Sequence, residues 1–518
     1  MLFNSYIFIF LFLPISLLGF FLIGKQGHHR IATSWLVACS LFFYGWWNPS
    51  YLGLIIASVL FNYAVGISLS SEKKRTSRKK LLTFGVGANL ALLGYYKYAG
   101  FFVDNLNLVL GYDLNFNNIV LPLAISFFTF QQIAYLVDAY KGETREYSFL
   151  HYCLFVTFFP QLIAGPIVHH KEMLPQFARD SIYQYSAKHL AVGITIFALG
   201  LFKKVVLADG ISVYATPAFQ AADQGVALTL FEAWGGVLAY TLQLYFDFSG
   251  YSDMAIGIAR MFGVRLPLNF NSPYKAANII EFWRRWHMTL SRFLKDYLYI
   301  PLGGNKKGSV RKQLNLIITM VLGGLWHGAG WNFVLWGTLH GFYLAVNHLW
   351  RMMIPIEKIK NPVINVANWF ITFLAVVVAW VPFRAETLGG AKYIWMGMLG
   401  VNGITIGNLQ EVNPYLWQIQ KMLTEHGVIV NGYIKQYKVP DDYMFMWILT
   451  LIVIVLLVPN TQQFMGRYRP AFEVYKDEIS PAKWYWRVSQ TWAVVVSVIM
   501  TAAILNLSRV SEFLYFQF

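Results

Sequence analysis

The sequence predicts an all-α protein that crosses a membrane many times. Hydrophobic residues make up 57% of the 518-residue chain and charged residues only 13%, about half the charged share of a soluble domain. The mean hydropathy is +0.48. Apolar runs of about 17 to 24 residues recur from end to end, each long enough to cross a hydrocarbon core about 30 Å thick. Run length predicts about 11 to 13 membrane segments, the clearest of which are 5–24, 51–70, 81–103, 119–139, 149–167, 189–207, 363–381, 444–458 and 488–507.

The first run is expected to remain as a membrane helix, because no Lys or Arg precedes it and no A-x-A-like cleavage site follows. Cys39 and Cys153 both fall within apolar segments. This position argues against a disulfide framework and against a cysteine metal site.

Basic residues concentrate in short connecting loops. The formal net charge is +16, and residues 71–80 hold six Lys or Arg, whereas residues 104–118 hold none. Cytoplasmic loops of membrane proteins are enriched in Lys and Arg, so residues 71–80 are predicted inside and both chain ends outside. We therefore expect these charges to meet anionic lipid headgroups of the bilayer, with no nucleic-acid partner.

The chain reads as one membrane domain over 1–518. Residues 1–150 read as helical hairpins, and residues 401–443 form a polar stretch, predicted outside, in which an amphipathic helix could lie on the membrane surface. Residues 240–350 mix apolar, aromatic, charged and Gly-Pro positions too densely for simple spans. Irregular backbone at membrane depth is tolerated where protein or water surrounds it. We interpret this block as re-entrant and interfacial helices that line an internal cavity.

His327 lies in "LGGLWHGAGWNF", an otherwise apolar and glycine-rich segment. A helix that begins near Gln313 would reach His327 after about 14 residues, or roughly 21 Å, which is well inside a bilayer. A break near "HGAGWN" would then start a second crossing. This segment alone fits two interpretations: a hydrogen bond between packed helices, or a general base that takes a proton from a hydroxyl near neutral pH.

His287 lies in "WRRWHMTLSRFLKDYLYIP" among four Lys or Arg and several aromatic residues. One interpretation is an interfacial helix with aromatic rings in lipid and arginines toward headgroups. The alternative is a binding surface for a phosphorylated or acidic donor, since Arg binds such groups in a bidentate manner. The residues that would form that surface are Arg284, Arg285, Trp286, Arg292 and Lys295.

Asp247 and Asp253 lie in the apolar stretch "QLYFDFSGYSDMAIG". Each carboxylate at membrane depth costs about 2.5–3.5 kcal/mol, so we expect them to cap broken helices or to pair with an arginine such as Arg260. Their spacing fits neither a paired-carboxylate hydrolase nor a ferritin-like metal site, and no metal site is predicted.

The other histidines and glycine-rich stretches carry weaker signals. His28, His29, His169 and His170 lie at loop edges and are expected to be interfacial. The stretch "GGNKKG" lacks the spacing of a Walker A loop, and no dinucleotide fingerprint, H-E-x-x-H or G-x-S-x-G is present.

Two central motifs carry a resemblance. "WRRWHMTLSRFLKDYLYIPLGG", followed about forty residues after His287 by "GGLWHGAGWNFVLWGTLHG", resembles the membrane-bound O-acyltransferase (MBOAT) family. More narrowly, the chain is similar to the bacterial polysaccharide O-acetyltransferases of the AlgI, or alginate acetylation, type. The supporting stretches are "MLFNSYIFIFLFLPI", "LPLAISFFTFQQIAYLVDAY", "FFPQLIAGPIVHH" and "YFDFSGYSDMAIGIARMFG".

The resemblance implies transmembrane and re-entrant helices around a central funnel or tunnel. It implies that His327 is catalytic and that His287 assists or lies near the path. With general-base chemistry implied, we expect Trp326 and Asn332 to shape the meeting point of donor and acceptor. Further residues expected to bind substrate or line the tunnel are Tyr245, Asp247, Asp253, Trp286, Arg284 and Arg285.

The resemblance also implies the substrates and the location. The donor would be cytosolic acetyl-coenzyme A or another acyl thioester, with no permanently bound cofactor. The acceptor would be a polysaccharide, a periplasmic partner acetyltransferase, or both. The protein would lie in the bacterial inner membrane with both ends periplasmic. Two alternatives remain at this point: transfer of D-alanine to teichoic acid within the same family, and a transporter or flippase.

Overall fold

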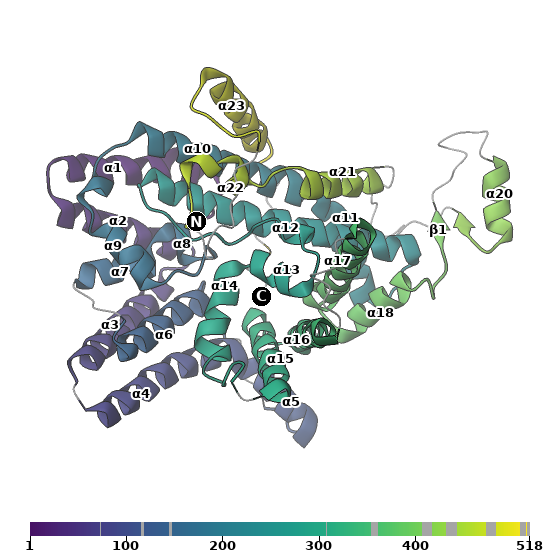
Figure 1. The fold of residues 1–518 in the computed structure, drawn as a ribbon, viewed down its shortest axis with the longest axis horizontal. Coiled ribbons are helices and arrows are strands. Elements are labelled where there is room, and N and C mark those ends of the chain that lie inside the picture. The colour runs from purple at the N-terminus through teal and green to yellow at the C-terminus, as the bar shows by residue number, and fades with distance from the viewer. Residues whose placement is uncertain are drawn as a thin grey trace.

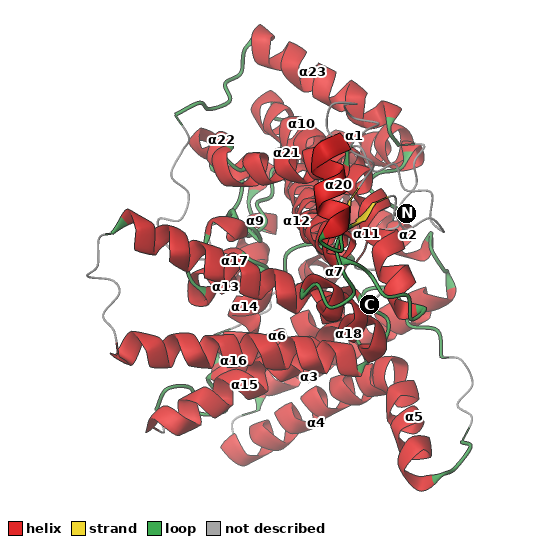
Figure 2. Ribbon diagram, turned by 90° about the vertical axis from the view of Figure 1, so that its right-hand side faces the viewer, coloured by secondary structure: helices red, strands yellow, loops and turns green. Residues whose placement is uncertain are grey.

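The computed structural model describes residues 1–72, 74–114, 119–143, 148–306, 308–353, 361–406, 417–430, 443–472, 483–507 and 514. These residues form a bundle of helices, and one pair of two-residue strands lies outside it (Figures 1 and 2). The predicted all-α fold class is therefore confirmed.

The N-terminal helices occupy one side of the molecule, where α3, α4 and α6 lie next to one another (Figure 1). Glycines in the left-handed conformation end two of these helices, Gly111 after α5 and Gly142 after α6, as is common at helix C-termini. The helices are α1 (Leu13–Lys25), α2 (His29–Gly45), α3 (Ser50–Ser71), α4 (Arg75–Leu93), α5 (Ala99–Leu110) and α6 (Ile125–Lys141), with π-helical turns at Phe8–Phe12 and Gly94–Tyr98.

The centre of the bundle is α12 (Leu230–Met261), a helix of 32 residues that is buried over nearly its whole length. Its N-terminus is closed by a capping box in which Thr229 and Glu232 satisfy each other's backbone N–H groups. Helices α10 (Ala187–Phe202) and α11 (Asp209–Asp223) pack along it, joined by a π-helical segment, Lys203–Ala208. Most of its side chains are apolar on every face, as expected of a central helix, but Asp247 and Asp253 are buried with them.

Among the residues that the structure describes, four helical stretches are long and apolar enough to cross a membrane: Phe8–Lys25, Ser50–Ser71, Ala187–Asp223 and Pro362–Arg384 (α17). Two shorter apolar helices are α21 (Met444–Leu457) and α23 (Gln490–Leu505). The protein is thus embedded in a membrane by several helices. The count of about 11 to 13 segments, which came from run length, stays a prediction.

The run 149–167 was predicted to be a single membrane crossing, but it does not form one continuous helix. It is divided into α7 (Phe149–Thr157), α8 (Phe159–Leu162) and a turn that leads to α9 (His170–Phe177). Pro160 begins a new short helix, and the turn contains Pro166, whose ring removes a backbone donor. Nearly all of this segment is buried inside the protein, so it is apolar because it forms core.

The remaining helices surround this core, and α15 and α16 run beside each other (Figure 2). They are α13 (Ile279–Arg285), α14 (Met288–Leu294), α15 (Gly308–His327), α16 (Trp331–Met353), α18 (Leu388–Met398), α20 (Trp417–Glu425) and α22 (Thr461–Phe464). Single turns occur at Asp180–Tyr183, Pro273–Lys275, Lys295–Tyr299 and Gly466–Tyr468.

Within the polar stretch 401–443, strands β1 (Thr405–Ile406) and β2 (Ile429–Val430) pair in parallel, and α20 projects away from the bundle (Figure 1). Residues 407–416 and 431–442 of that stretch lie outside the described residues.

Candidate active site

His327 is the last residue of α15, and α16 begins four residues later. The predicted break after this histidine is confirmed. Helices α15 and α16 pack so closely that glycine is needed at the contact. A Cβ atom at Gly337 would collide with the carbonyl oxygen of Met320, and one at Gly324 would collide with that of Phe333. Helix α15 begins at Gly308, earlier than the expected Gln313, so it rises about 28 Å before His327. The imidazole therefore lies at the C-terminal end of α15.

Aromatic rings surround the imidazole of His327, which is 5% exposed. The ring centroids of Trp326, Trp336 and Phe383 lie 4.9, 5.1 and 5.1 Å from that of His327, in edge-to-face orientation. We call these three residues the aromatic box. They come from α15, α16 and α17, so three separate helices hold one ring in place.

His287 lies beside the aromatic box. It occupies the junction of α13 and α14 in a left-handed backbone conformation (φ 43°, ψ 52°) and is fully buried. Few residues other than glycine adopt this conformation. The sharp turn brings its ring to 6.4 Å from His327 and 6.2 Å from Trp326, between centroids. The fold thus joins two histidines that lie forty positions apart in the sequence.

A lysine caps the carbonyl end of α15. Lys97 Nζ donates to the backbone oxygens of Trp326 and His327 at 2.6 and 3.0 Å, and Tyr98 Oη donates to the oxygen of Leu325 at 2.7 Å. A cation suits the negative end of a helix dipole. Sequence reasoning missed Lys97, although a single lysine in the apolar run "LLGYYKYAG" was the available signal.

Another buried histidine, His340, lies on α16 next to Trp336. Its Nδ1 accepts a hydrogen bond from Trp283 Nε1 at 3.3 Å, and its ring lies 4.9 Å from Trp336. Sequence reasoning missed this residue as well. Its spacing of four from Trp336, which places both on one helix face, was the signal.

A cavity of about 980 Å³ opens beyond the turn between α15 and α16, and we call it the turn-side cavity. Phe383 forms part of its wall and part of the aromatic box. Asn332 also lines it and donates from Nδ2 to the carbonyl oxygen of Ala385 at 2.6 Å, which ties the start of α16 to the end of α17. Its polar lining includes Asp104, Asn105, Gln220, Gln243, Arg384 and Glu386.

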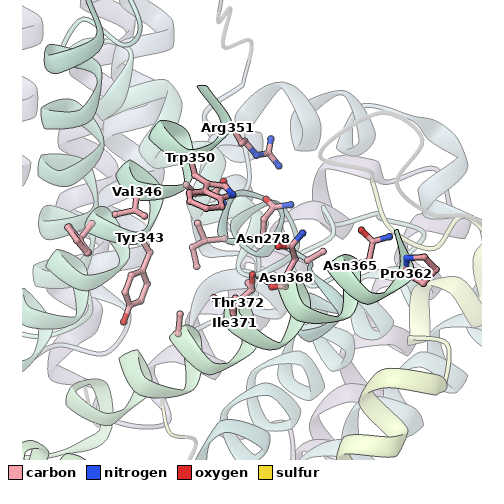
Figure 3. Close-up of a pocket in the computed structure, with 15 residues that line it drawn as sticks. Asn278, Tyr343, Val346, Trp350, Arg351, Pro362, Asn365, Asn368, Ile371 and Thr372 are labelled. Atoms are coloured by element: carbon pink, nitrogen blue, oxygen red, sulfur yellow. Dashed lines mark hydrogen bonds between the residues drawn. The ribbon is translucent and has the colours of Figure 1, made fainter. Parts of the chain in front are cut away.

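A second cavity, of about 810 Å³, lies between the other ends of α16 and α17 (Figure 3). We call it the asparagine cavity, because Asn278, Asn347, Asn365 and Asn368 line it. Tyr343, Trp350 and Arg351 complete much of its wall. Since α16 and α17 contribute opposite ends to the two cavities, the cavities lie at opposite ends of this helix pair.

Packed rings stand between the two cavities. Tyr343 lines the asparagine cavity and lies 5.8 Å from His340, which in turn contacts Trp336 of the aromatic box. Trp380 of α17 stacks on Trp336 at 5.9 Å. A continuous tunnel past His327 therefore stays a prediction, and this conformation holds aromatic side chains along its expected course.

Asp247 and Asp253 were expected to cap broken helices or to pair with an arginine, and the structure shows neither. Helix α12 runs unbroken through both, so neither caps a helix end. Lys204 Nζ lies 2.6 Å from Asp247 and 2.8 Å from Asp209, and Lys203 Nζ lies 2.6 Å from Asp253. We call these five residues the ion-pair cluster. Buried charges require such partners, and here lysines supply them instead of Arg260.

The other expected site residues divide into two groups. Trp286 is buried and packs 5.0 Å from Trp380, within the rings that separate the cavities. Arg284 is exposed, and Arg285 pairs with Glu281 at 2.6 Å on the surface of α13. Tyr245 lines a different cavity, of about 660 Å³, together with Lys203 and residues of α21 and α22. The structure thus brings Trp286 close to the histidines and places the two arginines and Tyr245 elsewhere.

His169 and His170 are buried, not interfacial as expected. The carboxylate of Asp138 accepts a hydrogen bond from Tyr297 Oη at 2.9 Å and lies 3.5 Å from His170 Nδ1. Tyr297 Oη also lies 3.1 Å from His169 Nδ1. The position of the two histidines at a loop edge in the sequence did not indicate that both would lie beside the buried carboxylate of Asp138.

Comparison with known proteins identifies the family. The model of the membrane-bound O-acyltransferase family matches residues 139–381. A peptidoglycan O-acetyltransferase of Helicobacter pylori is 44% identical over 83% of this chain and 86% of its own. A probable alginate O-acetylase AlgI of Azotobacter vinelandii is 41% identical over 84% and 86%. A teichoic acid D-alanyltransferase of Streptococcus thermophilus is 30% identical over 44% and 57%.

The matched region contains both histidines, Trp326 and Trp336 of the aromatic box, α12 and the asparagine cavity, and it ends two residues before Phe383. The matches to the peptidoglycan O-acetyltransferase and the alginate O-acetylase extend over most of both chains and agree with the resemblance seen in the motifs around His287 and His327. The chain therefore belongs to the membrane-bound O-acyltransferase family and is an acyltransferase of the AlgI type.

Proposed function

We propose that this enzyme moves acetyl groups from a cytosolic thioester, such as acetyl-coenzyme A, to an acceptor outside the bacterial inner membrane. The observation that carries the proposal is a pair of adjacent buried histidines between two cavities at opposite ends of α16 and α17. Donor and acceptor could then meet near His327 without either molecule crossing the bilayer.

His327 acts as the general base in this proposal. It takes the proton from an acceptor hydroxyl as the oxygen attacks the thioester carbonyl carbon. The carbon–sulfur bond then breaks, and the imidazolium returns the proton to the leaving thiolate. Such assistance contributes about 10²–10⁴-fold to a rate. His287 positions donor or acceptor, and the reaction requires no permanently bound cofactor.

The asparagine cavity is the proposed donor side. Arg351 in its lining fits the positive-inside rule and suits the phosphates of a nucleotide thioester. The turn-side cavity is then the acceptor side and faces the periplasm, as do both chain ends. The names of the relatives suggest a cell-envelope or secreted glycan, or a periplasmic partner that passes the acetyl group on.

D-alanyl transfer is a second candidate, supported by the teichoic acid D-alanyltransferase relative. It would require a carrier-protein thioester that docks on the cytoplasmic basic loops. Family membership makes an enzyme a better account than the transporter or flippase that composition alone allowed.

Proteoliposomes loaded with radiolabelled acetyl-coenzyme A test these functions. Label on an external glycan or partner supports acetyl transfer, and no label from acetyl-coenzyme A but label from a D-alanyl carrier protein supports the second candidate. Substrate movement without covalent labelling would overturn both.

A further inference from the structure

We infer that Asn269 is a positioning residue that holds the neutral imidazole of His287 in the tautomer with its proton on Nδ1. This inference rests on the proposed acyl-transfer function and names a residue that sequence reasoning did not single out. Asn269 lies in the loop between α12 and α13 and is fully buried.

The hydrogen-bond network settles which way the amide of Asn269 faces. Its Oδ1 accepts from Thr289 Oγ1 at 2.9 Å and from the backbone N–H of Thr289 at 3.4 Å. A backbone N–H can only donate. The hydroxyl of Thr289 already accepts from the N–H of Ile167 at 3.0 Å, so its own proton points to Asn269. On the other side, Asn269 Nδ2 donates to Ser252 Oγ of α12 at 3.4 Å.

The tautomer of His287 follows from that orientation. His287 Nδ1 lies 3.1 Å from Asn269 Oδ1, which is an acceptor without a proton. In a neutral imidazole one nitrogen donates and the other carries the lone pair. Nδ1 therefore carries the proton, and Nε2 carries the lone pair with which His287 can accept a hydrogen bond from a substrate hydroxyl and position it.

Asn269 also holds the backbone beside the ring. Its carbonyl oxygen accepts from the N–H of Met288 at 3.0 Å. His287 itself has a positive φ, a conformation that persists only when surrounding contacts require it. Two bonds from one residue thus fix both the ring and the backbone of the histidine. Similar outer partners of functional histidines elsewhere set ring orientation and tautomer.

The rings in contact with His287 come from α12, the α12–α13 loop and α15. They are Phe248, Phe270, Trp326 and His327, of which His327 is the one that titrates. Beyond it, Lys97 holds the end of α15. A carboxylate placed at position 269 would therefore be a new charge beside His287.

Three variants in the full-length enzyme test the inference: Asn269→Ala, Asn269→Asp and Thr289→Val. We expect Asn269→Ala to lower kcat about 10- to 100-fold with little change in the KM for acetyl-coenzyme A. Asn269→Asp keeps an acceptor for Nδ1 but favours the imidazolium, so the acid limb of its kcat/KM profile should move up by about 1 to 3 pH units. Thr289→Val removes a neighbouring bond of Asn269 and should leave that limb in place.

A double-mutant cycle with His287→Ala separates positioning from general damage to the fold. If Asn269 acts through His287, Asn269→Ala should have no further effect on kcat in the His287→Ala background. Equal losses in both backgrounds would overturn the inference. Should His287→Ala leave no measurable turnover, an Asn269→Asp profile identical to that of the native enzyme would overturn it instead. Absence of acetyl transfer by the native enzyme would contradict the proposed function itself, which is a separate outcome.

Discussion

The ion-pair cluster and the aromatic box hold ionisable side chains in a protein interior by different means. In the cluster, two lysines lie 2.6 to 2.8 Å from three carboxylates of α11 and α12, so each buried carboxylate has a cation beside it. In the box, His327 is enclosed by three aromatic rings from three helices, with His287 next to it. An ion pair with short contacts on every side is suited to holding helices together. A ring-enclosed imidazole between two cavities is suited to proton transfer.

The largest expected effect is the loss of the imidazole in the aromatic box. His327→Ala should lower acetyl transfer about 10²–10⁴-fold, because general-base assistance is removed. The melting temperature should also fall, because loss of a buried ring leaves a cavity, so the loss of the base is read from turnover per folded molecule. Turnover and melting of purified enzyme measure the two effects, with His28→Ala on the surface as the matched control.

The next effect concerns the ion-pair cluster and should fall on stability instead of chemistry. Lys204→Met leaves Asp247 and Asp209 buried together without their cation, which should cost about 3–5 kcal/mol. Chemical unfolding in detergent measures the loss. Turnover per folded molecule should change far less than in His327→Ala, and a variant that is as stable as the native protein but inactive would reverse the two roles.

A smaller effect is expected where α15 meets α16. Gly337→Ala forces a Cβ atom into the carbonyl oxygen of Met320, and such overpacking costs about 1–3 kcal/mol. We expect lower thermal stability and a moderate loss of turnover, because this contact positions His327. Gly53→Ala on α3 is the matched control, since no atom lies within 4 Å of its added methyl group. Equal melting temperatures for both variants would count against the close helix contact.

The smallest effect should come from the surface of α13. Arg284 is exposed, so Arg284→Ala should change stability by no more than about 0.5 kcal/mol. If Arg284 contacts the donor as the motif predicts, the KM for acetyl-coenzyme A should rise about 2- to 10-fold with kcat unchanged. Initial rates over a range of acetyl-coenzyme A concentrations measure the KM. An unchanged KM would show that Arg284 does not contact the donor.

Local pattern predicted a large part of the architecture. Apolar run length indicated the helices, and the glycine-rich segment after His327 indicated the break between α15 and α16. The two motif histidines were expected to act together, and the fold places them 6.4 Å apart. The helices and the break follow from residues close to one another in the chain, where periodicity and turn chemistry are informative. The joint role of the two histidines was expected only from the family resemblance.

Long-range partners could not be predicted from the sequence. Lys97 caps a helix end 230 positions away, and Lys203 and Lys204 pair with aspartates as far as fifty positions later. The run 149–167 was read as a crossing because apolar composition does not distinguish lipid contact from core. Likewise, the left-handed turn at His287 depends on Asn269, and nothing in the local sequence indicates that contact.

Acetyl transfer per folded molecule, measured in proteoliposomes for two variants side by side, tests the division of roles most directly. One variant is His327→Ala, and the other replaces part of the ion-pair cluster with apolar residues: Lys204→Met, Asp209→Leu and Asp247→Leu. We expect the first to lose at least about 100-fold and the second to stay within about tenfold of the native rate, the equivalent of 1.4 kcal/mol. A His327→Ala enzyme that turns over as fast as the native protein, or a cluster variant that folds but is inactive, would contradict the account.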